Sequence, residues 1–328
     1  MKLRICALVA GLAFAAAASA QTTLNVITAG DQNMVDYVNN YLAPKFEAAN
    51  PGVKVRAVGT GPGDAGSQKI YEKLSAQQKA GSNEWDVDVA VVHQLASASM
   101  VNEKLLMPYR SDVAVGKLVT RDTAKNALGS NVDGYVLPMF HSQIVFAYNP
   151  DLVKSPPRSF AELNEWVKKN PKQFGYNGVK GGMSGVGFVT GWVSAYSGLA
   201  DKLENGPYDP TSGPAIDKAL AGLKEFNQYV VMTPGNAGTL DMLNRGEIAM
   251  GPVWVDMFYT WQADGIVKQF NWYPGIDPQF VQPKLDQAAW NKLFTDVSPA
   301  DLSKYGRPFP LSPYFKQITE GYERVVLK

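Results

Sequence analysis

The sequence predicts an α/β fold in which mainly parallel sheets are flanked by helices, because strand and helix patterns alternate along the chain. Three observations predict it: a strand–helix–strand unit over residues 23–58, a second helix and strand over residues 67–92, and a buried strand at 248–255. The strand at 85–92 has a continuous apolar end, which suits a sheet covered on both faces. Hydrophobic residues make up 45% and charged residues 19% of the chain, so we expect a packed core.

The first unit has a clear order of local signals. Residues 23–28 alternate like a strand, and apolar residues from Met34 to Phe46 recur at the three- and four-residue spacing of a helix. Pro51 and Gly52 end that helix, because proline cannot continue it and glycine reverses the chain easily. Residues 53–58 then predict the next strand.

Later elements follow from the same signals. Ser159 and Glu162 have the spacing of a capping box, which predicts a helix over residues 160–169. A strand at 144–148 marks the predicted crossing between two lobes. Further helices are predicted at 188–198, 215–230 and 240–245, and the tail from Gln287 is helical and irregular by turns.

The first twenty residues have the pattern of a removable export leader. Lys2 and Arg4 give a basic start, an apolar run follows, and small residues at Ala18 and Ala20 precede the expected cut. We therefore expect residues 1–20 to be a signal peptide and the mature chain to work in the periplasm. Cys6, the only cysteine, lies in this leader, so no disulfide is expected in the mature chain.

The charge balance excludes one class of partner. Without the leader, which holds two of the 31 basic residues, 29 basic residues face 30 acidic ones. A near-neutral chain without a basic stripe does not predict a nucleic-acid partner. Past the leader no apolar stretch is long enough for a membrane span.

Five segments in this order resemble the extracellular solute-binding proteins that feed bacterial ABC importers. They are FEAANPGVKV at 46–55, WDVDV at 85–89, FAYNPDL at 146–152, FAEL at 160–163 and LNRGEIAM at 243–250. The resemblance implies a two-lobed, type II periplasmic-binding-protein-like fold with a ligand between hinged lobes. On this basis lobe 1 spans residues 21–145, lobe 2 spans 146–258, and 259–328 is a partly helical segment with a truncated return to lobe 1.

The chain departs from the family pattern near residue 265. Family members usually continue there for several dozen residues, with a strand back across the hinge and a helix over the first lobe. Here Gly265 runs directly into a segment, residues 270–276, that resembles what normally follows. We interpret this as an internal deletion that shortens lobe 1 by a strand and weakens closure.

Candidate ligand residues lie at the predicted cleft edges. Open parallel sheets bind ligands beyond the carboxyl ends of their strands, and crossing segments and a glycine-rich helix start flank the same cleft. The candidates are Asp31, Gln32, His93, Gln94, His141, Ser142, Gln143, Ser184, Trp254 and Asp256. Purely structural roles remain open as alternatives: Asp31 as a helix cap, the histidines bonded to the backbone in turns, and Trp254 as part of the hydrophobic core. For Trp192 we favour a place in the hydrophobic core.

Three sequence patterns that could indicate a cofactor, a metal or a nucleophile give little support to these functions. Residues 61–66 fit G-x-G-x-x-G and Asp86 follows, but an exported chain is far from nicotinamide pools and Asp86 starts its strand instead of ending it. Two histidines without a thiol make a poor zinc site. Val186 stands where a nucleophile elbow around Ser184 needs glycine. We therefore expect no cofactor, no metal and no catalytic residue.

The function predicted from the sequence is binding without chemistry. The mature chain is expected to be a monomer that captures one small polar solute, sugar-like or otherwise organic, and delivers it to an inner-membrane ABC permease. Two alternatives remain: an exported hydrolase, which needs a nucleophile with a base or two placed carboxylates, and a sensor that uses the same cleft to signal.

Overall fold

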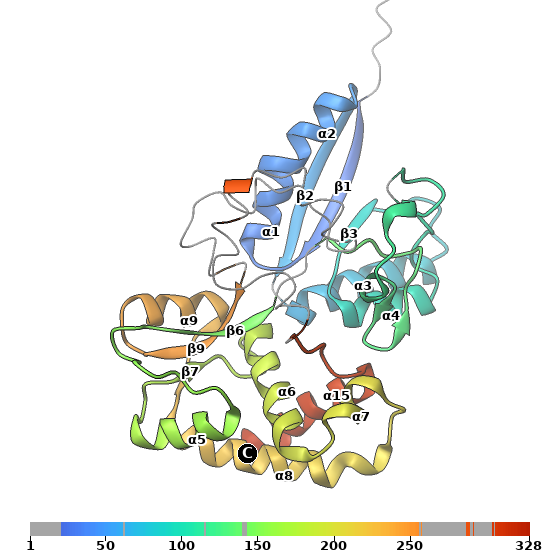
Figure 1. Cartoon of the computed structure of the whole chain (residues 1–328). Coiled ribbons are helices and arrows are strands. Elements are labelled where there is room, and N and C mark those ends of the chain that lie inside the picture. The colour runs from blue at the N-terminus through green and yellow to red at the C-terminus, as the bar shows by residue number, and fades with distance from the viewer. Residues whose placement is uncertain are drawn as a thin grey trace, which may run out of the picture.

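The computed structural model describes residues 21–61, 63–114, 116–139, 143–255, 257, 287–288, 291, 304 and 306–328. Two lobes lie one above the other in Figure 1. Lobe 1 holds strands β1 to β5 and helices α1 to α4, and lobe 2 holds β6 to β9, α5 to α9 and α15. The predicted leader, three of the candidate residues (His141, Ser142 and Asp256) and the site of the suspected deletion lie outside the described residues.

Lobe 1 is built on a parallel sheet with the strand order β2-β1-β3. The strands are β1 (Thr22–Ala29), β2 (Val53–Gly61) and β3 (Val89–Val91). β3 is shorter than the predicted strand at 85–92. Just before it the side chain of Asp88 accepts a hydrogen bond from the Asn25 N–H at 2.7 Å, in place of a backbone carbonyl. The side chain thus ends the regular ladder.

The first helical stretch of lobe 1 is interrupted by a wide turn. It consists of α1 (Gln32–Tyr37), the π-helical turn η1 (Val38–Leu42) and α2 (Ala43–Ala49). Pro44 has no N–H for the usual bond to the carbonyl four residues earlier, and the Ala43 N–H bonds instead to the Val38 carbonyl, five residues back. The apolar periodicity predicted the helix but not this turn.

The two faces of the lobe 1 sheet carry different helices. Val26 of β1 packs with Val38 of η1 and Ala57 of β2 on one face. Its neighbour Ile27 points to the opposite face and packs with α3 (Gly63–Lys79) and α4 (Gln94–Asn102). Beyond α4 come η2 (Gly116–Leu118), η3 (Asp122–Ala124) and the hairpin β4 (Asn126–Ala127) and β5 (Ser130–Asn131).

Lobe 2 combines parallel and antiparallel pairing. β7 (Gly175–Tyr176) and β8 (Val231–Met232) are parallel, whereas β6 (Ile144–Tyr148) and β9 (Met250–Trp254) are antiparallel. A parallel bridge between Phe174 and Met250 joins the two pairs. β6 starts at the lobe boundary and β9 ends there, so the two strands must run in opposite directions.

Helices cover the lobe 2 strands. They are α5 (Phe160–Lys169), α6 (Met183–Ser197), α7 (Ala200–Asn205), η4 (Pro210–Ser212), α8 (Gly213–Phe226), η5 (Asn227–Tyr229) and α9 (Gly235–Asn244). α5 has the predicted bounds, and the Ser159 hydroxyl caps it by accepting from the Glu162 N–H at 3.1 Å. The Glu162 carboxylate reaches back one residue further than a capping box requires, to the Arg158 N–H.

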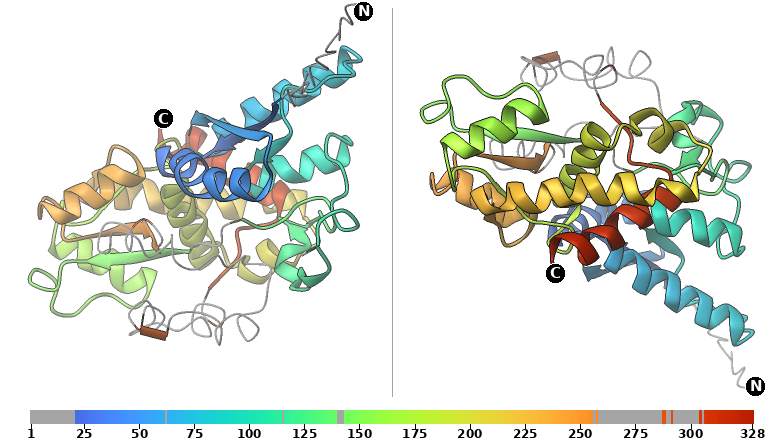
Figure 2. Two further views of the ribbon diagram at one scale, coloured as in Figure 1. Left: turned by 90° about the horizontal axis from the view of Figure 1, so that it is seen from above. Right: turned by 90° about the horizontal axis from the view of Figure 1, so that it is seen from below.

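Most of the described C-terminal residues pack on lobe 2, while the Ser312 N–H also donates to the Leu128 carbonyl of lobe 1 at 2.9 Å, so the truncated return to lobe 1 stays a prediction. α15 (Ser312–Gly321) and the π-helical turn η7 (Tyr322–Val326) lie against α8, and α15 also contacts α6 (Figure 2). The buried side chains of Tyr314, Ile318 and Tyr322 join the core of lobe 2. Their apolar face accounts for this placement.

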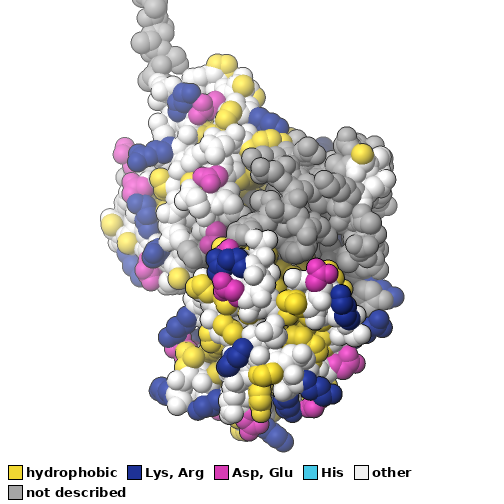
Figure 3. Space-filling view, turned by 90° about the vertical axis from the view of Figure 1, so that its left-hand side faces the viewer, with side chains coloured by type: hydrophobic (Ala, Val, Ile, Leu, Met, Phe, Trp, Pro, Cys, Tyr) yellow, Lys and Arg dark blue, Asp and Glu magenta, His cyan; other side chains and the backbone are white. Residues whose placement is uncertain are grey.

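The described helices and the charged side chains on one face (Figure 3) bear on the charge and hydrophobicity patterns of the sequence. Among them no helix is both long and apolar enough to cross a bilayer. On the face in Figure 3, basic and acidic side chains are interspersed over the described atoms. This view agrees with the near-neutral composition.

Candidate functional site

A large open cavity lies at the carboxyl ends of β1 and β3 and is lined by both lobes. Its volume is about 3000 Å³. Lobe 1 contributes Asp31 and His93, and lobe 2 contributes Asn236 and Trp254. The cavity therefore lies where the strand topology predicts a ligand site.

Asp31 follows β1 and faces the cavity. It occupies the N-cap position of α1 with an extended backbone, but its carboxylate makes no capping hydrogen bond, so the capping role considered from the sequence is wrong. The next residue, Gln32, is exposed, bonds to Asp36 at 2.9 Å and does not line the cavity. Of this predicted pair, only Asp31 reaches the cleft.

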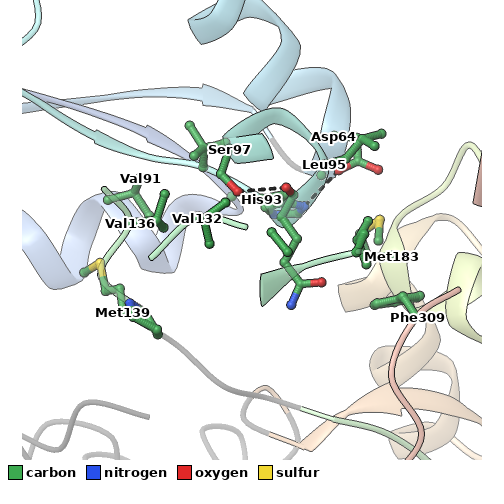
Figure 4. A pocket seen from close by; sticks show the side chains of 18 of the residues that line it. Asp64, Val91, His93, Leu95, Ser97, Val132, Val136, Met139, Met183 and Phe309 are labelled. Carbon is green, nitrogen blue, oxygen red and sulfur yellow. Dashed lines mark hydrogen bonds and ion pairs between the residues drawn. The ribbon is translucent and has the colours of Figure 1, made fainter. Parts of the chain in front are cut away.

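His93 meets a carboxylate that the sequence analysis did not select. Its Nδ1 lies 3.4 Å from Oδ1 of Asp64, in the first turn of α3, and both side chains are about one third exposed. Figure 4 shows the two side chains directed toward one another on the cavity wall. The His93 backbone N–H donates to the buried Ser67 hydroxyl at 2.9 Å, which fixes the start of α4. The adjacent Gln94 is exposed and lines the cavity.

Gln143 and Trp254 lie where the chain crosses between the lobes. The Gln143 carbonyl accepts from the Val255 N–H at 2.9 Å, and Trp254 pairs with Ile144 across β9 and β6. Both residues line the cavity, and Trp254 is only partly buried. A partly exposed indole at this position offers an apolar face to a ligand.

Ser184 does not reach the cavity surface. It lies in the first turn of α6, its side chain is fully buried, and its hydroxyl bonds to Oδ1 of Asn236 at 2.8 Å and of Asn177 at 3.2 Å. The sequence analysis placed it at the helix start as a ligand group. Because the helix begins at Met183, the side chain of Ser184 instead turns inward, toward the two asparagines.

The glycine-rich turn at residues 61–66 has a structural explanation. A Cβ on Gly66 would lie 2.0 Å from the Gly61 carbonyl oxygen, so the turn itself requires glycine there. Asp86, the acid of the dinucleotide alternative, pairs with Lys73 at 2.6 Å, and this hydrogen bond lowers the pKa of Asp86. Trp192 is core, as predicted, with Nε1 donating to the Ala219 carbonyl at 2.8 Å.

The described residues contain no group of three or more potential metal ligands among their histidines, cysteines and acids. The Asp64–His93 pair, the amides of Gln94 and Asn236 and the indole of Trp254 line the same cavity. Such a set can donate and accept hydrogen bonds to a polar molecule.

The sequence profile of the bacterial extracellular solute-binding protein family matches residues 41–272. The chain belongs to this family. A search of curated protein sequences finds no match.

Solved structures show that this solute-binding protein shares the two-lobed fold of periplasmic binding proteins. A maltotriose-bound protein of Thermus thermophilus is 19% identical with a TM-score of 0.53, over 93% of this chain and 87% of that chain. A maltose-bound T. maritima protein is 16% identical, with a TM-score of 0.54 over 93% and 86%. A spermidine/putrescine ABC transporter substrate-binding protein of Streptococcus pneumoniae is 15% identical, with a TM-score of 0.50 over 71% of this chain. This chain spans only 62% of that protein's length.

Two cleft residues of this solute-binding protein escaped the sequence analysis. Asp64 follows the end of β2, and Asn236 follows β8 by a few residues at the start of α9. Each comes after a strand and a glycine, at the start of a helix. The rule that selected Asp31 and His93 would have found Asp64, because the strand at 53–58 was predicted. It would not have found Asn236, because the short strand β8 was not predicted.

Proposed function

We propose that the protein captures a small polar solute between its lobes in the periplasm and delivers it to the permease of an ABC importer, without chemical conversion. The cavity carries this proposal, because family membership gives the role and the cavity brings polar side chains from both lobes to one space. A solute held there would touch both halves and favour closure.

The side chains around the cavity favour a polar organic solute. Asp31 and Asp64 can accept hydrogen bonds, the amide of Gln94 can donate and accept, the Asn236 Nδ2 can donate, and Trp254 adds an aromatic face. The related structures hold maltose and maltotriose, and one relative is named for spermidine and putrescine. We place sugar-like solutes ahead of these polyamines for this chain.

The test is a thermal-unfolding screen of residues 21–328 with maltose, maltotriose, sorbitol, citrate, spermidine, putrescine, thiamine and ferric citrate. A solute at 100 times its Kd should add about 2.7 kcal/mol to the free energy of unfolding. Asp31→Asn should weaken the effect, whereas Asp36→Asn on the same helix, outside the cavity, should not.

Two outcomes would overturn the proposal. A folded protein that no probe stabilises would argue against solute capture. Turnover of a bound probe, followed by chromatography of the incubated mixture, would support the hydrolase alternative.

A further inference from the structure

The carboxamide of Asn236 is held by side chains from two other segments of lobe 2. Its Oδ1 accepts from the Ser184 hydroxyl at 2.8 Å, from Nδ2 of Asn177 at 2.9 Å and from the Ser184 backbone N–H at 3.3 Å. Ser184 is fully buried and Asn177 is 5% exposed. Because a backbone N–H can only donate, the third bond fixes which end of the carboxamide is oxygen.

The other end of the carboxamide remains available at the cavity. Asn236 is partly exposed and lines the cavity, and its Nδ2 has no partner among the described residues. A carboxamide nitrogen carries two N–H donors and no acceptor. With the oxygen already engaged, Asn236 offers the cavity hydrogen-bond donors only.

The glycine-rich turn before α6 is shaped around these two asparagines. A Cβ on Gly182, whose φ is +141°, would lie 2.6 Å from Oδ1 of Asn236. A Cβ on Gly185 would lie 2.3 Å from Oδ1 of Asn177. Side chains at either position would displace the two amides. The turn therefore positions the side chains of Asn177 and Asn236 and does not itself bind the ligand.

The opposite wall of the cavity has the complementary character. Asp64 faces the cavity from the start of α3, and its carboxylate can only accept. Its neighbour Gly63 is close to the start of α6, since a Cβ built on Gly63 would lie 4.0 Å from Cγ of Met183. The chain next to Asp64 in lobe 1 therefore lies close to the start of α6 in lobe 2, the helix whose Ser184 holds Asn236.

We propose that Asn236 is a specificity-determining residue that donates from Nδ2 to an oxygen acceptor of the solute, with Asn177 and Ser184 as positioning residues. This inference rests on the proposed function and extends it. A solute with hydroxyl groups satisfies both walls, because a hydroxyl donates to Asp64 and accepts from Asn236. A protonated polyamine only donates, so it leaves the Asn236 N–H groups unpaired.

The decisive variant is Asn236→Asp. It keeps an oxygen for Ser184 and Asn177 but replaces the donating NH₂ by an acceptor of the same shape. Asn236→Ala removes both ends, and Asn244→Ala is the matched control, because Asn244 is the exposed last residue of the same helix and lies outside the cavity. Each variant is titrated calorimetrically with maltotriose, sorbitol, citrate and spermidine, and its melting temperature without solute checks that it folds.

We expect the tightest probe for the natural chain to bear an oxygen acceptor. Its Kd should rise about tenfold or more in Asn236→Asp and Asn236→Ala and stay unchanged in Asn244→Ala. Asn236→Asp should also improve the affinity for spermidine relative to that probe. Ser184→Ala should weaken binding in the natural background but have no further effect beside Asn236→Ala, which a merely structural role would not produce.

The outcomes separate this inference from the function beneath it. A probe that binds the natural chain and Asn236→Asp equally well would overturn the role of Asn236 and leave solute capture standing. Spermidine as the tightest probe would do the same. A folded natural chain that binds none of the probes would count against both. Equal losses from Ser184→Ala in both backgrounds would remove Ser184 from the positioning role.

Discussion

The two lobes differ in how their cores are assembled. Lobe 2 has one continuous cluster of 22 buried hydrophobic residues, which the C-terminal helix α15 completes. The described part of lobe 1 has three separate clusters of six, three and three buried residues. A continuous cluster unfolds as a unit, whereas small clusters open separately. We therefore expect lobe 2 to be the stable base of the molecule and lobe 1 the part that yields first.

The difference comes largely from aromatic side chains. In lobe 2, Phe188 of α6 lies at the centre of a network in which ring centroids are 4.6 to 6.3 Å apart. Its ring neighbours are Phe146, Phe160, Phe174, Tyr176, Trp192 and Phe226. Aromatic pairs at such distances stabilise a core beyond their buried area. The buried clusters of lobe 1 contain no aromatic residue among the described ones.

The largest effect should come from breaking this network. Phe188→Ala should lower the free energy of unfolding by about 3–5 kcal/mol, because it leaves a cavity where several rings meet. Urea denaturation followed by tryptophan fluorescence measures it, since Trp192 is in the same cluster. A loss below about 1 kcal/mol would contradict a cooperative lobe 2 core.

A matched pair of isoleucines compares the lobes directly. Ile216 of lobe 2 and Ile70 of lobe 1 are both fully buried. Each change to alanine should cost about 2–5 kcal/mol, with Ile216→Ala near the upper end, because a small cluster collapses more easily around a lost side chain.

Hydrogen exchange with mass spectrometry shows which lobe each isoleucine substitution destabilises. Ile70→Ala should increase exchange in β1, α3 and α4 while α6 and α8 stay protected. Ile216→Ala should expose lobe 2 as a whole. The reverse pattern, or equal exposure of both lobes by both variants, would refute independent opening of lobe 1.

The fold could be predicted best where its signals are local. Helix α5 has its predicted bounds, because Ser159 and the apolar spacing both lie within a few residues of it. β3 came out short because Asp88 bonds to Asn25, more than sixty residues away. The wide turn at η1 follows from Pro44, a residue that the helical periodicity does not register.

The sequence predicted the location of the site, at the carboxyl ends of the strands, but not which side chains face the cavity. Strand order placed Asp31, His93 and Trp254 at the cavity. It could not show that Ser184 turns inward, because the partners Asn177 and Asn236 come from distant parts of the chain. The direction of a side chain in the first turn depends on where the helix begins, and the glycine-rich sequence did not indicate the start of α6.

High pH should weaken the core of lobe 2. Burial raises the pKa of the Tyr176 phenol well above its usual value and also raises the pKa of Tyr322, whose hydroxyl is 3.4 Å away. Tyrosine in the unfolded chain ionises near pH 10. Above about that pH the unfolded chain therefore loses protons that the folded lobe keeps. The stability is therefore complete below about pH 10 and declines above it. Urea midpoints across this range should fall less steeply in Tyr176→Phe. Parallel slopes would contradict the assignment.

The smallest effect compares two helix starts. In lobe 2 the Ser159 hydroxyl caps α5, so Ser159→Ala should lower the free energy of unfolding by about 1 kcal/mol. In lobe 1 the Asp31 carboxylate occupies the N-cap of α1 without a capping bond, so Asp31→Ala should change stability by less than about 0.5 kcal/mol. Denaturation of both variants without solute measures the contrast. An equal loss would mean that Asp31 supports the helix after all. A neutral Asp31→Ala that binds solute more weakly would show that this carboxylate serves the cleft, whereas Ser159 serves its helix.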